Sequence, residues 1–165
     1  VKDSFSRLDL SIEDFARLVE GQWVWHDGSP ATVTARDRRW SAVSSPSGLE
    51  DWQRAWSRGE PDAAIFRPAL LAEPGVHVLA AREPEDAPDG PIVAGAIVSV
   101  SGPVAGVGNV FAVDGDEARV WREVAAHSRE LTGGLPLVGW EAGESLEKAV
   151  AAGCVRLGPL TVWIR

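Results

Sequence analysis

The chain has 165 residues and a mass of 17.6 kDa, a size that fits one domain around one hydrophobic core. Sixteen Lys and Arg residues stand against 24 Asp and Glu residues, and the net charge of −8 argues against binding to nucleic acid or to an anionic membrane surface. Cys154 is the single cysteine, which excludes an internal disulfide and a cysteine-built zinc site and favours a cytoplasmic location.

The amino-terminal third of the chain predicts one strand and two helices. Weak alternation over 5–10 favours a short strand. Ser11-Ile-Glu-Asp14 resembles a capping box, and apolar residues follow it at helical spacing, so we expect a helix over 12–21. A second capping box, Ser47-Gly-Leu-Glu50, predicts a helix that ends near 59–61. The segment between the two helices has no clear period.

The rest of the chain alternates strands and helices. The predicted order is strands over 76–81, 92–100 and 104–113, a helix from 114 to 132, a strand over 135–140, a helix over 143–152 and a strand over 156–164. The uncharged run 91–113 is long enough to cross a bilayer, but its Ser-Gly-Pro break at 101–103 indicates two buried strands and a turn. We therefore expect an α/β fold with a mostly antiparallel centre and one parallel strand-helix-strand crossover.

A central hairpin followed by helix, strand, helix and strand resembles the GNAT superfamily of N-acetyltransferases. Leu137-Val-Gly-Trp-Glu141 and Leu146-Glu-Lys-Ala149 look like the family's fifth strand and fourth helix. Ala152-Gly-Cys154 looks like its Gly-Phe turn, with the Cys in place of Phe, and 158–163 looks like its last strand. The resemblance implies a single GNAT-like α/β (α+β) domain over 1–165, with a mixed, mostly antiparallel sheet and helices on both faces.

The resemblance also implies acetyl-CoA as cofactor, held where the family's fourth and fifth strands separate. Its implied contacts lie at the end of the fourth strand and in the loop after it: Phe111, Ala112, Val113 and Gly115. The family's phosphate loop, Gln/Arg-x-x-Gly-x-Gly, is degenerate here, because 114–117 carries three carboxylates that repel a pyrophosphate and can cap the next helix themselves. Two interpretations stay open: the carboxylates replace the anion, or CoA binds in a different register with Gly115 as the close backbone approach.

Two residues are catalytic candidates. Glu141 closes the fifth strand, where a carboxylate can take the proton of an amine nucleophile, directly or through water. Asn109 follows Gly106-Val-Gly108 in an uncharged strand, and a bulge there would turn its amide into the cleft. The plainer interpretations are a solvated charge at a strand end and an amide bonded to backbone. Much of the family protonates the leaving thiolate with a Tyr, and the resemblance puts Ala149 at that position.

Aromatic residues mark a candidate acceptor site, made of Trp23, Trp25, His26 and Trp140. Tryptophans and an imidazole in close succession suit a planar or cationic ligand, although tryptophans also commonly fill a core. The three histidines, at 26, 77 and 127, have no metal-ligand spacing, so we expect no metal.

The sequence leaves two functions to weigh. The first is transfer of acetyl from acetyl-CoA to the amine of a small molecule, peptide or protein, with Glu141 as base. The second is a catalytically inactive GNAT-shaped module that binds a ligand or a protein partner, because the phosphate loop and the Tyr are both missing. Exposed tryptophans could also support a homodimer. Both functions depend on a gap between the strands at 110–113 and 138–141.

Overall fold

The uncharged stretch of the sequence forms the centre of the fold. A computed structural model describes residues 1–29, 38–60, 65–83 and 89–165. In it the uncharged stretch folds as strands β5 (Ala94–Ser101) and β6 (Val104–Ala112), which are joined at Gly102 with φ 66°. Apolar residues on both faces place this hairpin inside a sheet with the strand order β1-β8-β2-β7-β6-β5-β4-β3. Within the described ranges, no helix has the length and hydropathy needed to span a bilayer.

The other strands extend this sheet in both directions. They are β1 (Lys2–Asp3), β2 (Ala16–His26), β3 (Arg39–Ala42), β4 (Val76–Arg82), β7 (Leu137–Glu141) and β8 (Val155–Ile164). Neighbouring strands pair antiparallel except β6 and β7, which are parallel because helix α2 (Glu117–Thr132) carries the chain back between them. The mostly antiparallel sheet and the parallel crossover are confirmed.

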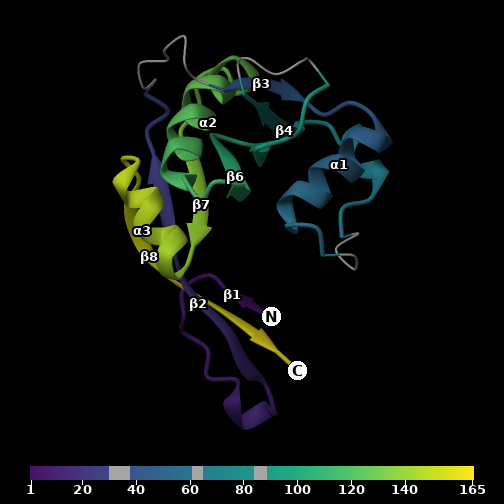
Figure 1. Cartoon of the computed structure of the whole chain (residues 1–165). Coiled ribbons are helices and arrows are strands. Elements are labelled where there is room, and N and C mark those ends of the chain that lie inside the picture. Colours follow the sequence, from purple (N-terminus) through teal and green to yellow (C-terminus); the bar gives the residue numbers. More distant parts are fainter. Residues whose placement is uncertain (30–37, 61–64, 84–88) are drawn as a thin grey trace.

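Helices cover both faces of the sheet, as the resemblance implied (Figure 1). Helix α1 (Pro46–Trp56) and the 3-10 turn η2 (Pro68–Ala72) lie on one face, and α2 and α3 (Gly143–Ala151) lie on the other. Alternation along the strands divides the core accordingly. Leu79 belongs to the hydrophobic cluster beneath α2, whereas its neighbour Val78 belongs to the cluster beneath α1.

Trp52 is the centre of the cluster beneath α1. Its side chain is fully buried, and its Nε1 donates a hydrogen bond of 2.8 Å to the backbone oxygen of Leu79. The ring packs edge-to-face against Phe66 and Phe111, at centroid distances of 5.4 and 5.2 Å. Because Phe111 belongs to β6, this indole fixes α1 to the strand that carries the candidate site.

The predicted helix over 12–21 is wrong. Only one 3-10 turn, η1 (Ser11–Glu13), forms there, and it ends at Asp14, which has a φ of 59°. The Ser11 hydroxyl donates to Asp9 Oδ1 and caps no helix. The next residues form β2, which pairs with β8 along most of its length. This long-range ladder outweighs the local helical spacing.

The predicted strand over 5–10 is also wrong, because the segment turns around Asp3. The Asp3 carboxylate accepts hydrogen bonds from the amides of Phe5 and Leu8, at 3.2 and 2.7 Å. Among residues 1–10, the ladder to β8 consists of Lys2 and Asp3 in β1, and Val1 exchanges backbone hydrogen bonds with Trp163 just before it.

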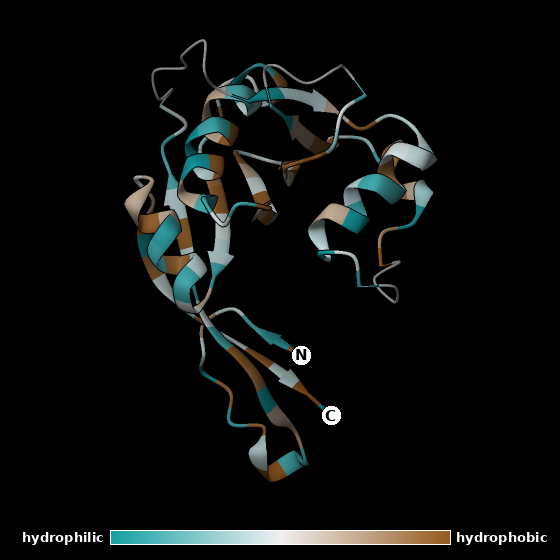
Figure 2. Cartoon of the chain, in the orientation of Figure 1, coloured by the Kyte–Doolittle hydropathy of each residue, from teal (hydrophilic) through white to brown (hydrophobic). Residues whose placement is uncertain are grey.

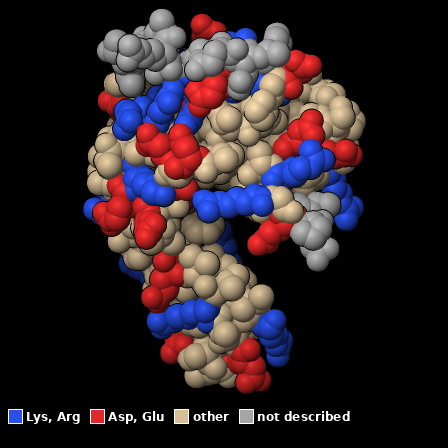
Figure 3. All heavy atoms as spheres, viewed as in Figure 1, with Lys and Arg blue, Asp and Glu red and all other residues tan. Residues whose placement is uncertain are grey.

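The long strands β2 and β8 project from the body as an arm, defined here as residues 1–21 and 159–165 (Figure 1). Hydrophobic residues are spread along it (Figure 2). Several expose half or more of their surface: Phe5, Leu8, Ile12, Leu18 and Ile164. Figure 3 shows the molecule hollowed between this arm and the end that carries α1.

Candidate functional site

The parallel strands β6 and β7 separate toward their carboxyl ends. Their register joins only Ala105 to Leu137 and Gly106 to Val138 within the described residues. At Gly139 the strands still touch, because a Cβ there would lie 2.7 Å from the backbone oxygen of Val107. Beyond that point β6 continues along β5 and β7 continues along β2. The ladder therefore ends before the stretch where the gap was predicted, and we call this unpaired stretch between the two strands the opening.

A β-bulge lies in β6 beside the opening, as predicted. The β5–β6 register passes from Gly95–Phe111 to Ile97–Gly108, so Asn109 and Val110 lie opposite a single residue. Asn109 is exposed and has a φ of 52°, an uncommon conformation for a residue with a side chain. A Cβ on Gly108 would meet no described atom within 4 Å, so the bulge faces open space.

Glu141 ends β7 on the α2 and α3 side of the sheet. Burial, and after it the nearby Glu117 carboxylate, raises the pKa of Glu141 to about 7. Glu117 itself accepts a hydrogen bond of 3.0 Å from the Ser145 hydroxyl and lies 3.4 Å from Lys148 Nζ. Glu141 is thus a half-buried carboxyl group that gains and loses its proton near neutral pH, which is the property of a general base. The interpretation of Glu141 as a solvated strand-end charge is wrong.

Cys154 is sealed beneath α3 and not exposed to reagents. The residue is 4 % exposed, and burial, followed by the charge of Glu141, raises the pKa of its thiol to about 12. Ala149, at the position of the family's Tyr, is fully buried as well. Ala149 has no proton to give, and the buried Cys154 thiol holds its proton more tightly than an ordinary thiol does.

We expect the Cys154 thiol to react at least about a hundredfold more slowly with a disulfide reagent in the folded chain than in the unfolded chain, because thiolate is the reactive form. The measurement is the absorbance of released thiolate with and without guanidinium, which should give one thiol per chain only after unfolding. Rapid stoichiometric reaction of the folded chain would contradict the burial of this side chain.

The loop between β6 and α2 satisfies its own amides. Asp114 Oδ1 accepts from the amide of Asp116 at 2.9 Å, and Asp116 Oδ1 accepts from the amide of Arg119 at 3.0 Å, which caps α2. The amide of Gly115 donates to the backbone oxygen of Ala112 at 3.1 Å. The pKa of Asp114 is lowered: burial would raise it, but the Asp116 amide and the Arg38 charge together prevail. These bonds favour the interpretation in which carboxylates replace the anion.

Arg38 completes the loop, and sequence reasoning missed it. Its guanidinium has no exposed surface, and Nη2 lies 2.7 Å from Asp114 Oδ2. Nε lies 3.5 Å from Glu83 and Nη1 lies 3.8 Å from Glu123, and neither nitrogen has a hydrogen-bond partner among the described residues. All three carboxylates come from distant parts of the sequence, so no local pattern marks them.

Tests for the implied cofactor give different answers at its two ends. At the opening, β6 beyond Gly106 has no ladder partner on its β7 side in the described chain, and a Cβ on Gly108 would meet no described atom within 4 Å, so an extended arm of CoA would find unpaired backbone there. The loop does not fit the diphosphate in the family's usual way. Asp114 and Asp116 already accept hydrogen bonds from amides at the start of α2, and their negative charges would repel a diphosphate. Phe111 and Ala112 are buried with the core, and Val113 donates its amide to Val93.

The four aromatic candidates are divided between the two faces of the sheet. Trp23 lies opposite Trp140 and Trp25 lies opposite Val138, so these tryptophans share the face away from α2 and α3. His26 is one residue out of phase and lies on the other face, where a Cβ on Gly153 would be 3.8 Å from its Nε2. Its Nδ1 accepts the amide of Gly28, a turn contact. The structure therefore separates His26 from the tryptophans.

A cation of the chain already covers two of these rings. Lys2 Nζ lies 4.7 Å from the ring centroid of Trp23 and 5.0 Å from that of Trp140. Each distance is typical of a cation–π contact. A cationic ligand placed on these rings would meet like charge, so of the planar and the cationic ligand that the sequence suggested, this contact favours the planar one.

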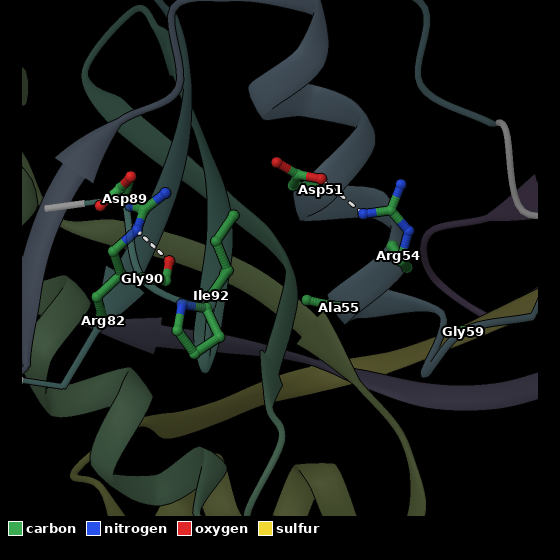
Figure 4. A pocket seen from close by; sticks show the side chains of 9 residues that line it. Asp51, Arg54, Ala55, Gly59, Arg82, Asp89, Gly90 and Ile92 are labelled. Carbon is green, nitrogen blue, oxygen red and sulfur yellow. Dashed lines mark hydrogen bonds and ion pairs between the residues drawn. The ribbon is translucent and has the colours of Figure 1, made fainter. Parts of the chain in front are cut away.

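A separate cavity of about 380 Å³ lies beside α1, at the end of β4 (Figure 4). Arg54 Nη1 pairs with Asp51 at 2.6 Å, and Arg82 Nε donates to the Gly90 oxygen at 2.8 Å. Both guanidinium groups therefore already have a partner in the wall of the cavity. Across the described ranges, no three His, Cys, Asp or Glu side chains come together as metal ligands.

Comparisons with known proteins find the fold and no close relative. No family model matches the sequence, and no curated protein is significantly similar to it. A GCN5-related N-acetyltransferase from Kribbella flavida is 16% identical, with a TM-score of 0.61 over 92% of this chain and 60% of that chain. A GNAT-family acetyltransferase from Colwellia psychrerythraea is 12% identical, with a TM-score of 0.59 over 100% of this chain and 66% of that chain.

A functionally unknown conserved protein from Staphylococcus epidermidis is 10% identical, with a TM-score of 0.68 over 94% of this chain and 67% of that chain. At such identities the likeness shows the fold alone, and the fold is GNAT-like. The chain spans less than two thirds of the length of the Kribbella flavida and Colwellia psychrerythraea proteins.

Proposed function

We propose that this chain, which has the fold of GNAT acetyltransferases, is an N-acyltransferase that takes an acyl group from acetyl-CoA and passes it to an amine. The observation that carries the proposal is the opening, where the ladder between β6 and β7 ends after two pairs and a bulge in β6 faces free space. Parallel strands that part at their carboxyl ends form a crevice, and ligands of open α/β sheets bind in such crevices.

The proposed chemistry needs one proton acceptor from the chain. The donor supplies an activated thioester carbon when it is bound. Glu141 takes the proton of the amine, through a water in the opening, as the new C–N bond forms and the C–S bond breaks. Solvent returns a proton to the thiolate, because neither Ala149 nor Cys154 can. The main contribution of the protein is to hold both reactants together.

A second function is favoured by the loop after β6. Asp114 and Asp116 accept hydrogen bonds from the amides that would otherwise donate to a diphosphate, and Arg38 forms an ion pair with Asp114. A GNAT-shaped module that binds a ligand without transferring an acyl group would carry such a loop.

Thermal unfolding with and without millimolar acetyl-CoA decides between these functions. A ligand at a hundred times its dissociation constant adds about 2.7 kcal/mol, which raises the midpoint of a chain of this size by roughly 5–10 °C. We expect such a rise, and we expect Gly108→Leu to remove it, because the new side chain enters the open space at the bulge. Gly158→Leu is the matched control, since Gly158 also faces open space but lies in β8. An unchanged midpoint in the parent chain would exclude the transferase.

A further inference from the structure

A pocket of about 560 Å³ lies on the tryptophan face of the sheet. Trp23, Val138, Leu157 and Pro159 come from three neighbouring strands, and Phe5 and Arg7 come from the segment after β1. Trp23 Nε1 donates a hydrogen bond of 2.9 Å to the Ser4 oxygen, which holds this segment to the strands. We call this cavity the Trp23 pocket. Its volume lies in the range of small-molecule sites.

The Trp23 pocket meets the opening at one residue. Val138 lines the pocket, and its partner across the parallel pair is Gly106, at the last ladder position before β6 and β7 separate. Trp140 follows two residues later on the same face. The pocket therefore lies beside the start of the opening.

The charged groups at the pocket are positive. Arg7 is the one charged residue that lines the pocket in the described part of the chain, and the Lys2 ammonium lies over the Trp23 ring. Asp3, the acid of β1, is buried and bonded to amides. These charges favour a carboxylate in the pocket. Glu141 ends β7 on the opposite face of the sheet, next to Glu117.

We infer that the Trp23 pocket binds the acceptor, an amine that carries a carboxylate on an apolar body, such as an aromatic or aliphatic amino acid. The inference rests on the proposed function for the acceptor role, but binding itself requires no donor. Arg7 and Lys2 select the carboxylate, the apolar wall takes the side chain, and the amine lies on the Val138 side of the pocket, next to the opening.

Isothermal calorimetry without acetyl-CoA tests the inference with matched pairs: L-phenylalanine with phenethylamine, L-leucine with isoamylamine, and L-tryptophan with tryptamine. In at least one pair the carboxylate-bearing member should bind about tenfold or more tightly than its partner. Arg7→Gln should remove that difference and leave the amine unchanged. Gly158→Leu should abolish binding, because its side chain enters the pocket.

Equal or weaker binding of every carboxylate-bearing member, or no heat from any probe, would overturn the inference. A preference that survives both Arg7→Gln and Gly158→Leu would place the ligand elsewhere and overturn it too. Amino-acid binding without any acetyl-CoA shift would leave the pocket standing and exclude the transferase.

Discussion

Glu141→Gln is expected to lower turnover by about 10²- to 10⁴-fold, the usual contribution of a general base, while the acetyl-CoA shift in unfolding temperature persists. The reason is that glutamine keeps the shape of the side chain and cannot accept the proton. Because burial raises the pKa of Glu141 to about 7, activity of the parent chain should rise with pH through about 7. The measurement is the release of free thiol from acetyl-CoA, with the amine pairs above as acceptors.

The same substitution has a signature in stability. A carboxyl group whose pKa is raised in the folded state stabilises the fold while it is protonated. For Glu141 this stabilisation is fully present below the ordinary pKa of 4.5 and is lost as the pH rises to about 7. The parent chain should lose stability over this window relative to Glu141→Gln. Glu144→Gln, at an exposed position at the start of α3, should show neither effect. Parallel pH profiles for all three chains would exclude Glu141 as the base.

Trp52→Ala is expected to destabilise the fold by about 3–5 kcal/mol, as large-to-small changes at buried aromatics do. The substitution empties the centre of the cluster beneath α1 and leaves the Leu79 oxygen without its donor. For a chain of this size the midpoint should fall by roughly 6–20 °C. Because Phe111 loses its edge-to-face partner, the bulge side of β6 should loosen as well.

The measurement is chemical or thermal unfolding followed by circular dichroism, with Trp56→Ala as control. Trp56 lies one turn later on α1, is only partly buried and packs against Phe66 alone among the described rings. Trp56→Ala should lower the free energy of unfolding by less than half as much as Trp52→Ala does. Equal losses for the two tryptophans would contradict the central place of Trp52.

Local sequence patterns are sufficient to predict the helices and strands in the half of the chain that carries the opening. The uncharged hairpin, the glycines before Asn109 and the helix that starts near Asp116 are all readable from adjacent residues, and their parts pair with near neighbours. Glu141 was predicted as a base from its place at a strand end, but its raised pKa comes from burial and from Glu117, at the start of α2. Sequence spacing could show neither the burial nor that proximity.

The predictions for residues 5–21 are wrong for a related reason: the structure there depends on residues that are distant in the sequence. β2 is a strand because it pairs with β8, at the opposite end of the chain, and its first residues have helical spacing. The alternation of Trp23 and Trp25 around a buried Val24 was the available signal. If residues 23–26 are taken as a strand, this alternation puts His26 on the opposite face from Trp23 and Trp25. Arg38 had no such signal, since its carboxylate partners come from three separate elements and loops.

The sealed thiol of Cys154 also restricts the order of events in acyl transfer. An enzyme that first stores the acyl group on its own side chain can release the spent donor before the second substrate arrives, and its double-reciprocal plots run parallel. The only cysteine here lies 4 % exposed within the core, so it cannot store anything. In the direct transfer of the proposed function, donor and amine have to be present together, so the plots should intersect and the rate at low concentrations should follow the product of both concentrations.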